Sequence, residues 1–251
     1  MMLARILRAA PSIFKLVGVS EPDDLRQGIE KLLDEPEARR ARETACRLAA
    51  SGLAAVGESL LVGGWLLRDD AARAVAVLTQ LAGELAESAV RLLEDGRAYG
   101  AAVLLRQLVE VEYLTYCFSR DKALAERWLT SSQEDLRRMF QPAAMRRLAG
   151  GIFRDEEYWT HCKLGGHPNP KAWVLLPGRE RAVDARWMWA DLAQHLERLW
   201  SLVMEAASAA GFEEALPVAE CAAATESIAA WSRVDILATR LPLSVLEGDT
   251  V

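Results

Sequence analysis

The sequence lacks most of the motifs by which an enzyme is usually identified. Its 251 residues contain only three histidines, and its four cysteines are far apart, with no Cys-x-x-Cys pair. A zinc site of the usual cysteine spacing is therefore not indicated. A P-loop, a dinucleotide-binding fingerprint and the His-Glu-x-x-His pattern of zinc proteases are also absent. From these absences we predict no metal ion and no cofactor.

Strand patterns are nearly missing as well. No alternating run of β-branched residues bounded by turn residues occurs along the chain. Apolar residues recur instead at the helical period, most clearly over 69–94, 97–118 and 184–210. The sequence therefore predicts an all-α protein, an irregular antiparallel helical bundle. Further helices are predicted over 37–57, 60–67, 119–140 and 218–238. A glycine break is expected between the first two of these.

Positive charge is not in excess. The chain carries 30 Lys and Arg residues against 36 Asp and Glu residues, a net charge of −6. No global basic field would attract nucleic acid, although a local basic groove is compatible with this total. One basic run could contact phosphate or simply form a solvated face, and it consists of Arg137, Arg138, Arg146 and Arg147. The widely spaced cysteines indicate a reducing, cytoplasmic location.

The chain is predicted to have two regions, an N-terminal helical arm over 1–45 and a helical bundle domain over 46–251. Residues 1–20 have an apolar face, which should dock on the body, a second copy, a partner protein or a membrane surface. The most apolar run, 49–67, includes Glu58 near its centre, so we expect a buried helix and no transmembrane segment. Self-association into a homo-oligomer, such as a homodimer, is also expected.

The segment 154–168 concentrates charge, aromatic side chains and two of the three histidines. Arg154 and His161 are separated by about 700° of helical rotation, so on a helix both would point to the same side. Tyr158 lies between them on the same strip, and Asp155 is one step away. The glycines and prolines over 165–170 then predict a loop.

Arg154, Asp155 and His161 form a pattern of an Arg, a polar residue and a following His that resembles the signature of HEPN-domain proteins. The resemblance implies an all-α, usually dimeric domain, and many such domains are metal-independent ribonucleases or relatives linked to defence and toxins. RNA would then be the partner. His161 would exchange a proton with the ribose 2′-OH, and Arg154 would stabilise the charge that builds on the phosphorane. Asp155 would orient its neighbours.

The chain also resembles a group of uncharacterised bacterial helical proteins. These carry an Arg and a Glu on one helix, and then a Tyr and one or more His before a Pro-containing turn. The matching residues here are Arg106, Glu110, Tyr158, His161 and His167. Arg106 and Glu110 are four positions apart and can pair along a helix. In an apolar helix such charges need a partner, which Tyr158 or His161 would supply.

Each of these residues also has an ordinary structural interpretation. Arg154 can bridge to a neighbouring carboxylate, and His161 can meet a backbone carbonyl near the loop. Arg106 and Glu110 can form a buried ion pair that fixes helix register. His195 has polar neighbours in an amphipathic helix and is expected at the surface. The alternative function is therefore a non-catalytic helical binding or interaction module in which the Arg-Glu-Tyr-His cluster is structural.

Overall fold

A computed structural model shows how the helices are arranged. The described residues are 28, 30–153, 155–166, 168, 172, 175–176 and 182–240. Within them the chain forms helices and no strand, which confirms the prediction of an all-α bundle. The first 27 residues, which make up most of the predicted N-terminal arm, lie outside the described residues.

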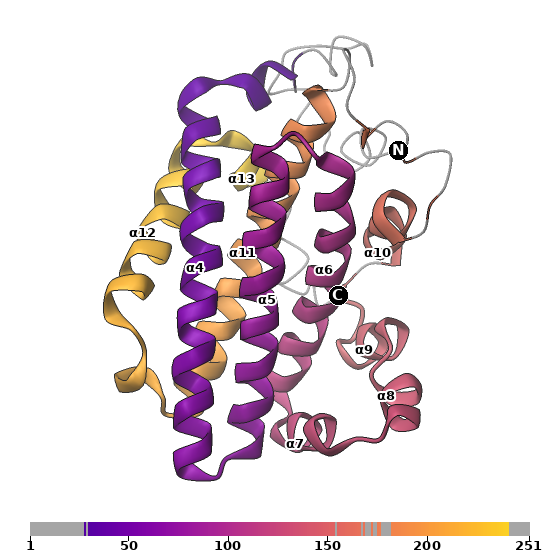
Figure 1. Ribbon diagram of the computed structural model, residues 1–251, viewed down its shortest axis with the longest axis vertical. Helices are drawn as coiled ribbons and strands as arrows, with labels where there is room; N and C mark the ends of the chain where they lie inside the picture. The colour runs from indigo at the N-terminus through magenta and orange to yellow at the C-terminus, as the bar shows by residue number, and fades with distance from the viewer. Residues whose placement is uncertain are drawn as a thin grey trace, which may run out of the picture.

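Three long helices run side by side in alternating directions (Figure 1). They are α4 (Pro36–Leu67), α5 (Asp70–Glu94) and α6 (Ala98–Arg120). Four short helices then carry the chain back beside α6, namely α7 (Lys122–Thr130), α8 (Gln133–Met139), α9 (Pro142–Leu148) and α10 (Asp155–His161). Because of this return, the next long helix runs in the same direction as α6.

The second half of the bundle covers the back of the first. A π-helical turn, η1 (Cys162–Gly166), extends α10, and the long helix α11 (Ala182–Ala209) packs against α4, α5 and α6. The chain then continues through η3 (Glu213–Ala215), α12 (Val218–Val234) and α13 (Ile236–Arg240). α12 packs along α4 on the side away from α6 (Figure 1).

α4 is one uninterrupted helix, so the predicted glycine break near position 57 does not occur. A Cβ atom on Gly57 would lie 2.7 Å from the backbone N of Gln80, and one on Gly83 would lie 2.7 Å from the backbone N of Ala54. These glycines therefore bring the α4 and α5 backbones close together instead of ending a helix. The predicted boundary between 45 and 46 also falls inside α4.

α4 is long and apolar enough to cross a membrane, and no other helix of the described residues passes that test of length and composition. Core helices of soluble proteins pass the same test. In this fold the middle of α4 lies in the core, where Ala49, Leu53 and Val56 have no exposed surface.

A fully buried ion pair fastens the C-terminal helices to α4. Arg42 on α4 donates from Nε to Oδ2 of Asp235 at 2.7 Å, and neither side chain has any exposed surface. The indole N–H of Trp231 donates to the same oxygen at 2.7 Å. Oδ1 of Asp235 accepts the backbone N–H of Leu237 at the start of α13. The link between α12 and α13 is thus fixed to the core by charge as well as by packing.

Candidate functional site

The predicted site segment packs directly against α6. A Cβ atom on Gly165 would lie 2.3 Å from the carbonyl oxygen of Ala102, so η1 meets α6 backbone to backbone. Only a glycine permits this approach. The predicted catalytic Arg154 and the supporting His167 lie outside the described residues, and so does the side chain of Asp155, which begins α10.

Three of the predicted residues do converge, as a triad of Arg106, Glu110 and Tyr158. Nη2 of Arg106 lies 2.7 Å from Oε1 of Glu110, as the four-residue spacing predicted. The same Nη2 donates to the Tyr158 hydroxyl at 3.1 Å, and that hydroxyl donates to Oε1 of Glu110 at 3.1 Å. The three contacts join α6 to α10. About a quarter of each charged side chain is exposed, 24% for Arg106 and 26% for Glu110.

The electrostatic setting of the triad favours a neutral phenol. Burial, contact with Cys162 and the negative charge of Glu110 raise the pKa of Tyr158 to about 12, although the Arg106 guanidinium opposes them. At neutral pH Tyr158 therefore keeps its proton and serves as a hydrogen-bond donor. Its ring also lies beneath a second guanidinium, since the Arg146 carbon is 4.5 Å from the ring centroid.

The predicted basic run is divided by the fold. Arg146 on α9 is buried against the tyrosine rings, while Arg137, Arg138 and Arg147 are exposed. Arg138 is paired with Asp135 at 2.7 Å within α8. The run is therefore partly a solvated face and partly support for the triad.

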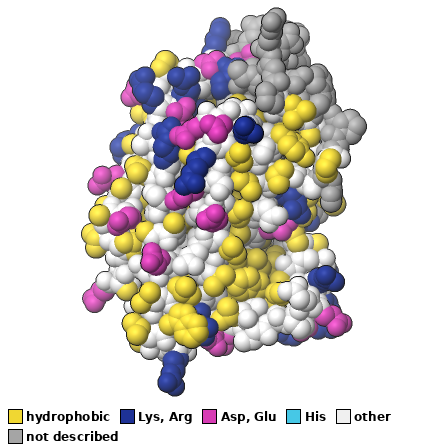
Figure 2. Space-filling model, viewed as in Figure 1, with side chains coloured by type: hydrophobic (Ala, Val, Ile, Leu, Met, Phe, Trp, Pro, Cys, Tyr) yellow, Lys and Arg dark blue, Asp and Glu magenta, His cyan; other side chains and the backbone are white. Residues whose placement is uncertain are grey.

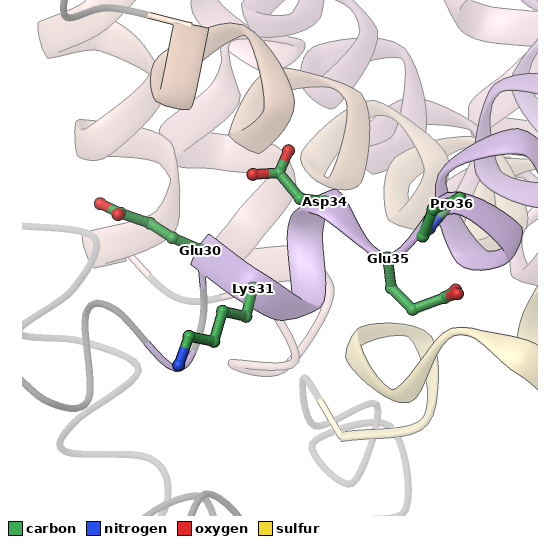
Figure 3. A pocket seen from close by; sticks show the side chains of 5 residues that line it. All are labelled: Glu30, Lys31, Asp34, Glu35 and Pro36. Atoms are coloured by element: carbon green, nitrogen blue, oxygen red, sulfur yellow. The ribbon is translucent and has the colours of Figure 1, made fainter.

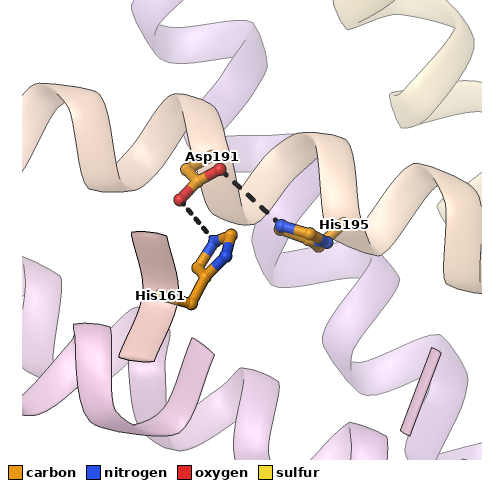
Figure 4. Close-up of side chains that lie close together, drawn as sticks. All are labelled: His161, Asp191 and His195. Carbon is orange, nitrogen blue, oxygen red and sulfur yellow. Dashed lines mark hydrogen bonds and ion pairs between the residues drawn. The ribbon is translucent and has the colours of Figure 1, made fainter. Parts of the chain in front are cut away.

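His161 does not belong to the triad, although Tyr158 is only one turn away on α10. Its Nε2 lies 3.0 Å from Oδ2 of Asp191 on α11, and only 5% of the residue is exposed (Figure 4). Tyr158 therefore contacts α6 and His161 contacts α11. The predicted strip of neighbouring side chains is divided between two partner helices.

The expectation that His195 lies at the surface is wrong. The residue is 1% exposed, because this face of α11 packs against α6 in the core. Its Nδ1 lies 2.7 Å from Oε2 of Glu112, a carboxylate that is itself 2% exposed. Its Nε2 is directed toward Asp191, 3.7 Å from Oδ1 (Figure 4). His161, Asp191, His195 and Glu112 thus form one buried network across α6, α10 and α11, which we call the histidine network.

We assign the His195 ring proton to Nδ1, because the Glu112 carboxylate can only accept. Nε of Arg198 lies 3.1 Å from the other Glu112 oxygen, an ion-pair distance without the alignment of a hydrogen bond. Nη2 of Arg198 also approaches His195 Nδ1 to 2.7 Å and so competes for the same ring nitrogen. The Nδ1–H tautomer lets Glu112 accept the ring N–H while its other oxygen faces the guanidinium.

Asp191 is the charged centre of the histidine network. Burial alone would raise the pKa of this carboxyl, but His161, through its charge and its hydrogen bond, together with His195 and Arg198, lowers the pKa to about 2. Asp191 is therefore ionised at neutral pH. Sequence reasoning missed it, although Asp191, His195 and Arg198 follow one another at the i, i+4 and i+7 spacing of a single helix face.

A surface hollow at the start of α4 is lined by residues that belong to neither cluster. It is lined by Glu30, Lys31, Asp34, Glu35 and Pro36 (Figure 3). Two of its carboxylates already have structural roles, because Glu35 caps α4 by accepting the N–H of Ala38 at 2.6 Å and Asp34 pairs with Arg186. The hollow is therefore not the candidate site.

No family model, no curated protein and no solved structure matches this chain. The resemblance to HEPN-domain proteins therefore stays a prediction from the residues that carry it. The geometry of the two clusters is the basis for a functional proposal.

Proposed function

We propose that this chain is a non-catalytic helical binding module. The observation that carries the proposal is the state of His161, the one histidine that the HEPN resemblance makes an acid–base catalyst. Its side chain is 6% exposed and hydrogen-bonded to Asp191, so it is not presented to a substrate in solution. A general acid or base must reach the proton that it transfers. The buried imidazole instead stabilises the docking of α10 on α11.

The ligand or partner would meet the Arg106–Glu110–Tyr158 triad, whose charged side chains are each about a quarter exposed. Trp159, the next residue after Tyr158, is 55% exposed and packs its ring beside the phenol. A guanidinium with an adjoining aromatic surface suits an anionic group on a small ligand or on a partner protein. Glu110 would then select ligands that also offer a hydrogen-bond donor.

The binding module can be tested with inorganic phosphate as a simple anion probe. Phosphate at millimolar concentration should raise the melting temperature of the wild type and not that of Arg106→Gln. Arg91→Gln is the matched control, because Arg91 is 73% exposed on α5 and pairs with Glu87, one turn away. An equal response of all three proteins to phosphate would refute the assignment of the ligand to Arg106.

A second candidate function is the metal-independent ribonuclease, or a defence- or toxin-associated relative, that the HEPN resemblance implies. The convergence of Arg106, Glu110 and Tyr158 favours it, because segments 48 and 52 residues apart come together at a partly open position. In this scheme RNA binds at the triad and His161 leaves Asp191 before it reaches a ribose. Arg154, Asp155 and His167 would complete the site.

Incubation with tRNA and total RNA in EDTA distinguishes the two functions. The binding module predicts that wild type and His161→Asn leave the RNA intact. Cleavage by the wild type that disappears in His161→Asn, with both proteins folded by circular dichroism, would establish the ribonuclease and overturn the module. Arg91→Gln again serves as the variant that should behave as the wild type does.

A further inference from the structure

The histidine network has the composition and spacing of a transition-metal site. His161, Asp191 and His195 each offer one ligand atom, and these atoms all lie within 4.8 Å of one another. In a tetrahedral zinc site with bonds of about 2.0–2.2 Å, neighbouring ligand atoms are about 3.3–3.5 Å apart. His161 Nε2 lies 3.0 Å from Oδ2 of Asp191, and His195 Nε2 lies 3.7 Å from the other carboxylate oxygen, Oδ1. These two distances are within about half an ångström of that spacing, whereas the 4.8 Å limit on the three ligand atoms exceeds it by about 1.3 Å, so a bound ion would draw the ligands closer together.

The helices already direct these ligand atoms inward. Asp191 and His195 are four residues apart on α11, so they share one face of the helix. His161 reaches the same point from the last turn of α10 (Figure 4). The exposed fractions of the three side chains are 6% for His161, 13% for Asp191 and 1% for His195. The cluster is therefore buried, unlike the exposed groups of acidic residues that are common on protein surfaces.

Glu112 orients His195 so that its other ring nitrogen can bind a metal ion. Metal-bound histidines usually donate their other ring N–H to a carboxylate, which fixes the tautomer and makes the ligating nitrogen more basic. Glu112 occupies that position here, 2.7 Å from Nδ1 of His195. With the ring proton on Nδ1, the Nε2 lone pair lies 3.7 Å from an Asp191 oxygen and 3.5 Å from Nη2 of Arg198, so that guanidinium would move aside for a metal ion. Two electron-pair donors that face each other across such a gap are suited to a shared cation.

The charges of the network also favour a cation. Two carboxylates, Glu112 and Asp191, share one guanidinium, since Arg198 lies 3.1 Å from Glu112 and its charge also acts on Asp191. From this geometry we propose that His161, Asp191 and His195 bind one first-row transition-metal dication, with Zn²⁺ as the best match. Two imidazole nitrogens and one carboxylate oxygen are borderline ligands of the kind that zinc and its neighbours prefer. Three protein ligands leave a further coordination position for water.

The bound ion would hold α10 and η1 on the bundle. His161 belongs to α10 and the other two ligands belong to α11, so the ion would join segments that are 30 residues apart. A ligand that binds only the folded chain stabilises it, and at about 100 times the dissociation constant the melting temperature should rise by about 5–10 °C. The inference goes beyond the proposed function, because the metal is assigned to the histidine network and not to the triad.

Titration of chelator-treated protein with Zn²⁺ in a calorimeter tests the site. The wild type should bind one ion with a dissociation constant below about 1 µM, and Co²⁺ should give the visible absorption of a four-coordinate site. Asp191→Asn and His195→Gln should weaken binding by 100-fold or more. Glu112→Gln should weaken it by about 10–100-fold, because it removes the residue that orients a ligand.

Two matched variants keep the test specific. Glu205→Gln removes an exposed carboxylate from the same helix, and Cys162→Ser removes the thiol beside His161, so both should bind Zn²⁺ as the wild type does. Binding that is lost in Cys162→Ser, or that is unchanged in Asp191→Asn and His195→Gln, would overturn the proposed ligand set. Failure of the wild type to bind Zn²⁺ or Co²⁺ below about 10 µM would overturn the proposal whether or not the variants fold.

Discussion

Replacing His161 by alanine in metal-free protein is the most informative perturbation of the candidate site. The substitution leaves Asp191, ionised and 13% exposed, without its closest partner at 3.0 Å. Breaking a buried ion pair by removing one partner costs about 3–5 kcal/mol, because the remaining charge is uncompensated. We expect the lower end, about 3 kcal/mol, since His195 and Arg198 still offset part of the charge of Asp191.

For a chain of this size, a loss of that magnitude lowers the melting temperature by about 6–12 °C. Urea unfolding in EDTA would give the free-energy change directly. The double variant His161→Ala/Asp191→Asn should be less destabilised than the sum of the two single variants by at least about 1 kcal/mol, because the two side chains interact. Arg91→Ala, on an exposed part of α5, should cost no more than about 0.5 kcal/mol.

The opposite result would refute the structural role of His161. If His161→Ala unfolds within about 0.5 kcal/mol of the wild type, the contact with Asp191 contributes little. The imidazole would then be available for chemistry, and the ribonuclease would become the better proposal. Loss of stability together with unchanged RNA would support the binding module.

Three further outcomes can be checked on the same preparations. Arg42→Met alone should destabilise by about 3–5 kcal/mol in urea unfolding, and Arg42→Met/Asp235→Leu by clearly less, because the second change removes the stranded charge. The raised pKa of Tyr158 means that its neutral form stabilises the fold fully below about pH 10 and progressively less as the pH rises toward 12. The stability difference between the wild type and Tyr158→Phe should therefore shrink between pH 9 and pH 12, and a constant difference would contradict the assignment. The predicted self-association should involve the exposed apolar end of α4, where Leu66 is 78% and Leu67 is 69% exposed, and which lies at the lower end of the face in Figure 2. Light scattering should then show a dimer for the wild type and a monomer for Leu66→Glu/Leu67→Glu, and equal masses would place any interface elsewhere.

Predictions from the sequence were correct where they depended only on residues of a single helix. The helical period of α5 and α11 and the pairing of Arg106 with Glu110 both depend on residues within about two turns of each other. The sequence also suggested Tyr158 as a partner of that pair, which the triad confirms. The glycine at position 57 was misread, because the same residue permits a break and a close helix contact, and only the neighbouring helix decides between them.

The sequence by itself determined that the chain is helical, where most of its helices lie and which polar residues stand out on them. It could not determine that His161 and His195 lie inside, because burial of a polar side chain depends on which helix covers it and on the partners supplied there. Only the packing of α6, α10 and α11 brought Glu112, Asp191 and the two imidazoles together from positions up to 83 residues apart. Hydrophobic periodicity fixes the apolar side of each helix, whereas the pairing of helices fixes which charges meet.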